Sequence, residues 1–461
     1  MLSDNTTKRQ SLQFLIGALL FAFVFRLTIG ILYTNTFDLH WYRHWAIEFQ
    51  EGFLDCYARL IERGTNVDYP LDYPPVYLFF LWPVGKLYQL LPLADYPMYD
   101  MLAMKFFPIL FDVLAAMMLY WACRRFSETT GLLAACLWAL NPSAIFNCAN
   151  WGQTDGMMVF LLVLALYVVE QGRPITGSVL FAVACLTKMQ CLYFTPLLFF
   201  YLLRRWDFKK TLYCIGSALG TGIAVFIPFI IGGWRLRGWK SLLIPFEIYF
   251  GGFGSYPYSA LNTYNLYGIW NLNWKSDSQS LLFGTWNEKL DMYTGGFTLH
   301  MLSTVFLLAS VIFLAYVILR GRCEGSLWVG GFMFMQCVFM LTTRMHERYQ
   351  FAVLPFALLA FTQLRSMRWF WMYVSLSLIT FLNQFMLLIK NNTIRDPAAP
   401  WRDWFNPAQA IFSAINLAIF AWGIYETWRF AFDTPSVPDD AMLEENTATD
   451  TQLLQSEQRG V

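Results

Sequence analysis

Long apolar runs separated by polar connections dominate this chain. They fall at residues 12–33, 106–123, 131–147, 156–170, 175–189, 191–203, 211–232, 297–319, 326–342, 349–364, 369–390 and 407–428. Several runs are shorter than the roughly 20 residues that an isolated spanning helix needs, so these helices must pack inside a bundle or end at a cavity. The pattern predicts an all-α polytopic membrane protein with about 12 transmembrane helices.

Short basic clusters lie between alternate helices and predict the orientation of the chain. They comprise Lys8–Arg9, Arg124–Arg125, Arg173, Arg204–Arg205 with Lys209–Lys210, Arg320 with Arg322, and Arg365 with Arg368. Because short cytoplasmic connections carry an excess of Lys and Arg, both termini are expected in the cytoplasm. The other connections are then expected on the outer side, at 34–105, 148–155, 233–296, 343–348 and 391–406.

One apolar run is expected not to cross the membrane. Residues 75–92 contain Pro83 and Lys86, and counting them as a span would move Arg124–Arg125 to the outer side. We therefore predict a helix that lies in the outer interface. Residues 39–62 also have interfacial character, because large aromatic residues recur there every four positions, at Trp41, Trp45, Phe49, Phe53 and Tyr57.

Composition agrees with the membrane assignment. Of 461 residues, 57% are hydrophobic and 14% are charged, whereas a soluble protein carries about 25% charged residues. The net charge of +1 offers no reason to expect a nucleic-acid partner. We expect one transmembrane domain over residues 1–432, with large external loops at 34–105 and 233–296. The acidic tail, 433–461, is expected to be disordered and cytoplasmic.

Four polar patches fall in the connections assigned to the outer side. They are Asp38 with His40, Arg43 and His44; NWGQTD at 150–155; TRMHERY at 343–349; and Tyr73-Pro74-Pro75 beside Asp68 and Asp72. Any one patch is more simply explained as an interfacial anchor. Their joint occurrence, with three of the four histidines on one side, indicates a functional site, because ionisable groups near membrane depth are costly.

Three further charged residues lie within predicted helices. Lys188 is expected either to extend its ammonium to the interface or to hold a phosphate. Asp112 has no cation partner visible in the sequence, so we expect a helix–helix hydrogen bond there. Arg26 is expected to extend towards the outer surface.

A metal site at the first polar patch is the weaker interpretation. Asp38, His40 and His44 are possible ligands, but their spacing matches no standard metal site. No divalent metal is therefore expected.

At these patches the sequence resembles the GT-C superfamily of polytopic glycosyltransferases, which use polyprenyl-phosphate sugars. It is most similar to the dolichyl-phosphate-glucose-dependent glucosyltransferases of N-glycosylation and to bacterial proteins related to the second mannosyltransferase of glycosylphosphatidylinositol synthesis. The matching stretches, in order, are Asp38 with RHW at 43–45, LDYPPVY at 71–77, NPSAIFNCANWGQTD at 141–155, LTKMQCLYFTPLLFFYLL at 186–203 and MHERYQFAVLP at 345–355.

The resemblance implies a GT-C fold with outer interfacial helices and assigns roles to residues. Asp38 corresponds to the general base, and His346 with Arg348 corresponds to the site near the carrier phosphate. The stretch CANWGQTD replaces a histidine-rich stretch of the glucosyltransferase branch, which favours the bacterial branch. The expected substrate-binding residues are Arg43, His44, Trp45, Tyr73, Trp151, Gln153, Asp155, Lys188, His346, Glu347 and Arg348.

The expected function is inverting transfer of a hexose, glucose or mannose, from a polyprenyl-phosphate carrier to a lipid-linked or other membrane-associated glycan on the outer or lumenal face. No cofactor is expected beyond the lipid-linked donor. Should Asp38 not be the base, the next candidates are Asp155, Asp72 and Glu347, in that order. The expected location is a bacterial plasma membrane or, failing that, the endoplasmic reticulum.

Two alternative functions remain open on the sequence. A transporter or flippase of a lipid-linked sugar usually shows repeats and charges near the bilayer midplane, whereas the charges here gather at one face. A polymerase or ligase of lipid-linked glycans would share the outer-face chemistry but use a lipid diphosphate donor.

Overall fold

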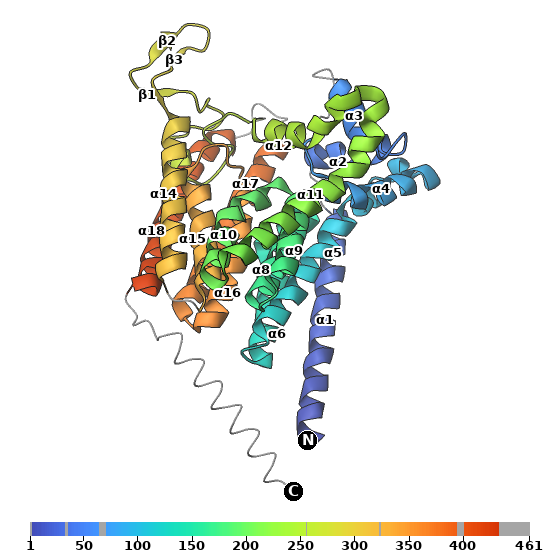
Figure 1. Ribbon diagram of the computed structural model, residues 1–461, viewed down its shortest axis with the longest axis vertical. Helices are drawn as coiled ribbons and strands as arrows, with labels where there is room; N and C mark the ends of the chain where they lie inside the picture. The colour runs from blue at the N-terminus through green and yellow to red at the C-terminus, as the bar shows by residue number, and fades with distance from the viewer. Residues whose placement is uncertain are drawn as a thin grey trace.

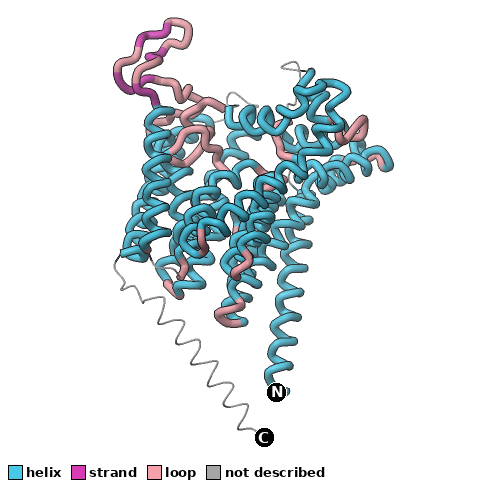
Figure 2. The backbone as a smooth tube through the Cα atoms, in the orientation of Figure 1, coloured by secondary structure: helices cyan, strands magenta, loops and turns pink. Residues whose placement is uncertain are grey.

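The computed structural model describes residues 2–32, 36–63, 71–254, 256–321, 324–393 and 401–432. Figure 1 shows a bundle of long helices with shorter elements gathered at one end, and Figure 2 shows that strands are confined to one projecting segment. The predicted tail at 433–461 lies outside the described residues, and so does Asp68.

Each predicted apolar run forms helix over most of its length. The principal helices are α1 (Leu2–Leu32), α5 (Pro97–Cys123), α6 (Glu128–Ala139), α8 (Asp155–Glu170), α9 (Pro174–Thr187), α10 (Thr195–Arg205), α11 (Phe208–Arg237), α14 (Leu299–Arg320), α15 (Ser326–Leu341), α16 (Leu354–Leu364), α17 (Met367–Thr393) and α18 (Trp401–Phe432). Within the described residues, six helices are long and apolar enough to span a membrane, or seven if α6 and the bent segment Pro142–Trp151 form one span. The all-α polytopic prediction is confirmed, while the number of about 12 spans stays a prediction.

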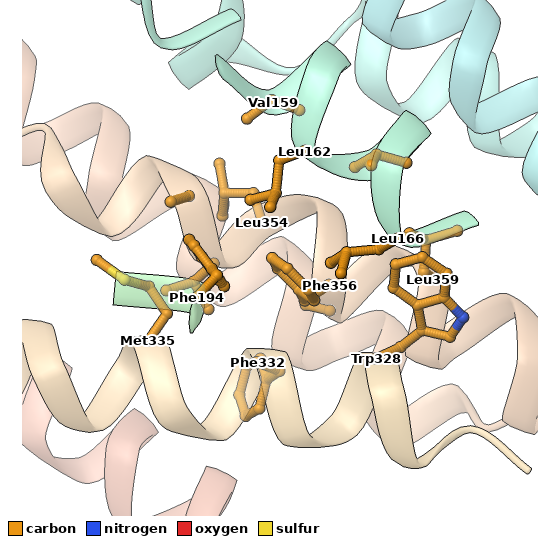
Figure 3. Close-up of a cluster of buried hydrophobic side chains, with 14 of the residues drawn as sticks. Val159, Leu162, Leu166, Phe194, Trp328, Phe332, Met335, Leu354, Phe356 and Leu359 are labelled. Atoms are coloured by element: carbon orange, nitrogen blue, oxygen red, sulfur yellow. The ribbon is translucent and has the colours of Figure 1, made fainter. Parts of the chain in front are cut away.

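The shorter helices pack in the interior of the bundle. Every residue of α15 from Ser326 to Met340 is buried, and Figure 3 shows α15 facing α8 and α16. Phe194, which precedes α10, stacks on Phe356 of α16 with ring centroids 5.0 Å apart. Because protein surrounds these helices, they need not match the full thickness of a bilayer.

The basic connections gather at the end of the bundle away from the short elements. Arg125 lies 2.8 Å from Glu170, and Arg204 donates to the carbonyl of Ile318. The N-terminal end of α1 and the C-terminal end of α18 lie at this same end (Figure 1). The arrangement has the parity that the basic clusters predict.

Three helices of the connection between α1 and α5 lie at the opposite end, namely α2 (Thr36–Glu48), α3 (Cys56–Glu62) and α4 (Pro75–Leu90). Pro75 begins α4 at a position where its missing N–H costs nothing. Figure 1 shows α4 running across the direction of α5. At 16 residues this helix is shorter than the six that pass as candidate spans among the described residues; its interfacial location stays a prediction.

The aromatic stripe of residues 39–62 does not face the membrane as expected. Trp45, Phe49 and Tyr57 are at most 1% exposed and belong to a core cluster shared with α4 and α11. Arg59 closes the turn between α2 and α3 by donating to Glu48 at 2.7 Å. Aromatic residues at helical spacing fit a protein core as well as a membrane face, and here the neighbouring helices cover them.

The second large external connection contains α12 (Ile244–Gly254), α13 (Leu266–Ile269) and a projecting pair of small sheets. The strands are β1 (Ser280–Leu282), β2 (Thr285–Asn287), β3 (Met292–Thr294) and β4 (Phe297–Thr298). β2 and β3 are antiparallel with Trp286 opposite Tyr293, and β1 pairs with β4. Residues 256–277 bind back onto the connection after α15, because Leu261 N–H donates to the Met345 carbonyl at 3.2 Å.

Arg26 and Asp112 form a buried ion pair between α1 and α5. Their nitrogen and oxygen atoms are 2.8 Å apart and both side chains are fully buried. Asp112 also accepts from the indole of Trp138 at 3.2 Å, and Arg26 donates to the carbonyl of Ala139 at 2.8 Å. The helix–helix hydrogen bond expected at Asp112 is therefore confirmed, and its partner is Arg26. The expectation that Arg26 extends to the surface is wrong, because Asp112 compensates its charge in the interior.

Candidate functional site

Asp38, near the beginning of α2, is the centre of a cluster of side chains at the loop-rich end of the bundle. Its Oδ2 atom accepts from Trp151 Nε1 at 2.5 Å and from Gln153 Nε2 at 2.6 Å. Asp38 itself is half-buried. Two neutral donors therefore orient the carboxylate through its Oδ2 atom.

The turn that carries Trp151 and Gln153 depends on an unusual backbone. α7 (Pro142–Ile145) continues into a π-helical turn, η3 (Phe146–Trp151), of the kind often found at functional sites. The turn ends at Gly152, whose φ is +77°. A Cβ atom at Gly152 would lie 2.6 Å from the Leu39 side chain, so glycine allows this turn to approach α2 closely.

Tyrosine hydroxyls connect Asp38 to the beginning of α4. Tyr42 donates to Gln153 Oε1 at 3.3 Å, and its hydroxyl lies 2.9 Å from that of Tyr73. The Tyr73 hydroxyl lies 3.4 Å from Thr154 Oγ1. Trp45 packs beneath this chain, with its ring centroid 5.6 Å from Tyr73. Tyr73 and Trp45 are thus brought to the cluster, Trp45 as a core residue.

Lys188 is paired with Asp155 in the interior. The ammonium donates to Asp155 Oδ1, and both side chains are 2% exposed. Asp155 Oδ2 accepts from Asn147 at 2.9 Å. Lys188 therefore does not extend to the interface, and the Asp155 carboxylate already compensates its charge.

The connection after α15 supplies a second charged group, Glu347 with Arg348. Arg348 NH1 lies 2.8 Å from Glu347 Oε1, and its guanidinium carbon lies 5.8 Å from the ring centroid of Trp151. The Nε atom of Arg348 is buried and has no hydrogen-bond partner among the described residues. A buried guanidinium donor of this kind calls for a hydrogen-bond acceptor, and an anionic ligand can supply it.

Burial and charge shift the pKa values of the neighbouring groups. Burial would raise the pKa of Glu347, but Arg348 and His346 outweigh it and lower the value to about 2. Burial lowers the pKa of His346, so this imidazole is neutral at neutral pH and can donate a hydrogen bond without carrying charge. Arg348 is then the fixed positive charge of the connection.

Asp72, which directly precedes the YPP turn, completes the charged cluster. Burial raises its pKa to about 6, Asp38 acts in the same direction, and Arg348 and Lys188 oppose the shift. Asp38, Lys188 and Arg348 come from three segments that are distant in sequence. Each lies close enough to Asp72 to influence its pKa. Asp38, Asp72, the Lys188–Asp155 pair and Arg348 form one electrostatic unit.

Arg43 pairs with α5 and with its own helix rather than with Asp38. Arg43 NH1 lies 3.0 Å from Asp100 of α5, and its NH2 atom lies 2.9 Å from His40 Nδ1. His44 is half-buried on the same helix. The polar patch that is continuous in sequence therefore divides, with Asp38 facing Trp151 and Arg43 facing α5.

Three residues of the cluster were not proposed from the sequence. Tyr42 donates to Gln153, Asn147 donates to Asp155, and Tyr256 packs edge-on to His346 with centroids 5.0 Å apart. Tyr42 and Asn147 lie inside or beside the stretches that carry the resemblance, so they could have been found there. Tyr256 comes after α12 in a stretch without a recognisable motif, so it has no such signal.

Among the residues that the structure describes, no group of three or more His, Cys, Asp or Glu side chains is arranged to hold a metal ion. His40, one of the three possible ligands, instead contacts Arg43.

Comparisons with known proteins show that part of the chain is similar to glycosyltransferases. Residues 71–256 match the model of Glycosyltransferase family 87. The chain is also 28% identical over 162 residues to a Gibberella zeae protein named dolichyl pyrophosphate Glc1Man9GlcNAc2 alpha-1,3-glucosyltransferase, an alignment covering 32% of this chain and 31% of that protein. The chain thus spans about a third of that relative's length. Together the two matches support a GT-C-type glycosyltransferase, which confirms the resemblance predicted from the sequence.

Proposed function

We propose that this membrane-embedded protein is an inverting hexosyltransferase that takes its sugar from a polyprenyl-phosphate carrier and transfers it to a membrane-associated glycan. One observation carries the proposal. A hydrogen-bonded carboxylate, Asp38, shares a site with Arg348, whose buried Nε atom has no partner among the described residues. A proton acceptor and an anion-binding group side by side suit glycosyl transfer from a phosphate donor.

The donor phosphate would bind to Arg348, with His346 donating a neutral hydrogen bond. As the bond between the anomeric carbon and the phosphate oxygen breaks, its electron pair passes to the leaving phosphate. A positioned guanidinium stabilises this developing charge. Lys188 is already paired with Asp155, so we assign it a positioning role beside the phosphate rather than the direct phosphate contact expected from the sequence.

The acceptor hydroxyl would be activated by Asp38. Its oxygen attacks the anomeric carbon from the face opposite the phosphate, and its proton moves to the Oδ1 atom of the carboxylate. Trp151 and Gln153 hold the other oxygen and prevent rotation of the carboxylate. A single displacement of this kind inverts the anomeric centre. The proposal uses no metal ion and no cofactor besides the lipid-linked donor.

The family match supports glycosyl transfer, and the name of the Gibberella zeae relative refers to a glucosyltransferase and to a dolichyl pyrophosphate glycan. Glucose is therefore the first sugar to test, followed by mannose. A transporter or flippase is disfavoured because the charged cluster lies at one end of the bundle.

A transfer assay tests the proposed function. Purified protein in lipid nanodiscs is incubated with radiolabelled polyprenyl-phosphate glucose or mannose and a panel of lipid-linked saccharides. We expect a labelled product of inverted configuration with one of the two donors, and at least about 10²-fold slower product formation with the Asp38→Asn variant. Absence of transfer with every donor and acceptor, alongside protein-dependent movement of donor across the bilayer, would instead establish the transporter.

We also propose that the site faces the outer side of a bacterial plasma membrane, with both termini in the cytoplasm. The basic connections at the opposite end of the bundle support this orientation. Asp95, in the short turn η2 (Leu93–Asp95) after α4, reports it directly. An Asp95→Cys variant is expected to react with an impermeant maleimide added outside intact cells. Labelling only after the cytoplasm is opened contradicts the orientation.

A further inference from the structure

An apolar groove lies between the C-terminal half of α4 and the first turns of α5, apart from the charged site. Its volume is about 690 Å³, within the roughly 300–1,000 Å³ of ligand sites. Its walls include Val84, Leu87 and Leu91 from α4 and its C-terminal cap, and Leu102, Ala103 and Phe106 from α5. None of these six side chains has a hydrogen-bonding group, so this part of the groove fits hydrocarbon and offers nothing to a sugar or a phosphate.

The groove opens towards lipid. α5 is one of the helices long and apolar enough to span the membrane, and α4 runs across its direction (Figure 1). Leu87 and Phe106, which line the groove, are 42% and 40% exposed, and Leu90 on the last turn of α4 is 76% exposed. Large apolar side chains exposed beside a spanning helix indicate that hydrocarbon surrounds them.

A polar contact lies next to the groove and connects it to the helix that carries Asp38. Asp100, 3% exposed on the first turns of α5, accepts from Arg43 of α2 at 3.0 Å and from Tyr88 of α4. Asp100 directly follows Tyr99, which lines the groove. The groove is therefore apolar along its walls and bordered by charge on the side of α2. This polarity matches a lipid whose head group points towards the site.

We propose that the groove binds the hydrocarbon chain of a lipid-linked glycan that serves as the acceptor. The inference rests on the proposed function. Inversion requires the acceptor and the leaving phosphate to approach the anomeric carbon from opposite faces. The groove is formed by α4 and α5, which both pack on α2 and hence on the Asp38 side. The turn after Arg348, η6 (Tyr349–Val353), packs instead on α8, α15, α16 and α17. The groove and the proposed phosphate site are therefore built on different helices, as binding of acceptor and donor from opposite sides requires.

The separation between groove and site sets the size of the acceptor head group. Val84 lies nine residues after the first residue of α4, or about 14 Å along the helix, and Tyr73 of the site precedes that helix. A simple alcohol bound in the groove could not present its hydroxyl to Asp38. A lipid whose chain carries one or more sugars could bridge this distance.

Photolabelling tests the groove without requiring turnover. The probe is hexadecyl glucoside with a diazirine near the end of its alkyl chain, added to the full-length protein in nanodiscs. We expect cross-links within residues 83–107. Unlabelled hexadecyl glucoside should compete, whereas methyl glucoside and phosphatidylglycerol should not. Competition by phosphatidylglycerol at equal concentration would identify bulk lipid in the groove and overturn the proposal.

A pair of tryptophan variants provides the control. Ala103→Trp fills the groove. Leu114→Trp places the same side chain on the same face of α5, three turns further along, at a half-buried position that does not line the groove. Displacing even two methylenes should raise the half-saturating probe concentration about tenfold or more in Ala103→Trp, with no change in Leu114→Trp. Equal labelling of both variants and the parent protein would refute the groove as the binding site.

Donor binding, measured in parallel with polyprenyl-phosphate glucose, separates the two substrates. It should be equal in the two tryptophan variants. A tenfold weaker donor affinity in Ala103→Trp alone would assign the groove to the donor chain and reject the acceptor. Failure of the proposed function can be distinguished from failure of the groove proposal. If the groove is labelled but no glycosyl transfer is found with any donor, the groove binds lipid and the protein has another activity.

Discussion

Two buried ion pairs in this protein look alike in isolation but have different surroundings. Arg26–Asp112 and Lys188–Asp155 each join a cation and a carboxylate that are at most 2% exposed. The first pair lies between α1 and α5, where Trp138 and a backbone carbonyl provide further hydrogen bonds. The second lies beside Asp38, Asp72 and Arg348 in the candidate site.

The difference shows that burial and pairing do not by themselves identify a functional charge. Removing one partner of any buried pair leaves an uncompensated charge and is strongly destabilising. Only the pair in the candidate site also acts electrostatically on Asp72 and on Arg348, the residue that we propose to contact the donor. Substituting one residue of the Lys188–Asp155 pair should therefore lower both stability and activity. Substituting one residue of the Arg26–Asp112 pair should lower stability alone.

The largest effect is expected at Asp38. Asp38→Asn keeps the size of the side chain but removes the proton acceptor, so single-turnover transfer should fall by about 10²–10⁴-fold. Trp151 and Gln153 can still donate to the amide oxygen, so donor binding and thermal stability should be retained. If the variant transfers sugar at the parental rate, Asp38 is not the base, and Asp155 becomes the next candidate.

The second effect separates the two ion pairs. Asp112→Asn leaves Arg26 charged and buried, which should lower the free energy of unfolding by about 3–5 kcal/mol. Turnover per folded molecule should remain at the parental level. Asp155→Asn is the matched variant and should lower stability and turnover together. Equal loss of turnover per folded molecule in both variants would remove the distinction between the pairs.

A smaller effect is expected at Arg348. Loss of hydrogen bonds from a charged donor costs about 1.5–3 kcal/mol, so Arg348→Ala should weaken donor binding by about 10- to 150-fold. Arg348→Lys should recover only part of this loss, because an ammonium cannot bind phosphate bidentately. Isothermal titration with a non-hydrolysable donor analogue gives the affinity. Undiminished binding by the alanine variant would exclude Arg348 from the phosphate site.

The smallest effect is a pH dependence that arises from Asp72. With a pKa of about 6, this carboxyl is neutral at pH 5 and negative at pH 7. The added negative charge beside Arg348 should weaken binding of the anionic donor by less than about tenfold as the pH rises through 6. Asp72→Asn should remove this dependence. A pH profile unchanged in that variant would assign the titration to another group, with His346 the nearest.

The Asp72 carboxyl also makes the stability of the folded protein depend on pH. Its folded-state pKa lies above its ordinary value, so between about pH 4 and pH 6 the folded protein holds a proton that the unfolded chain has released. Stability therefore falls as the pH rises through this window. Thermal unfolding of the parent protein and Asp72→Asn across the window measures the contribution.

The apolar periodicity of the sequence by itself determined the helices. A run such as 326–342 can be placed from composition alone, because a long apolar segment must satisfy its backbone groups as helix in a membrane. The parity of the basic connections also predicts that 75–92 does not span. The sequence also indicated Asp38, Tyr73 and Arg348, because each lies in a polar patch between apolar runs.

Only the tertiary structure decided which charges meet. Arg26 and Asp112 are 86 residues apart, and Arg43 and Asp100 are 57 residues apart. Pairing at such separations depends on the rotation and depth of each helix, which periodicity does not specify for helices that are apolar on all sides. In the folded protein Arg43 pairs with Asp100 and Asp38 with Trp151, although Arg43 and Asp38 lie on the same helix. The helices follow from local chemistry, whereas the site arises from the packing of helices distant in sequence.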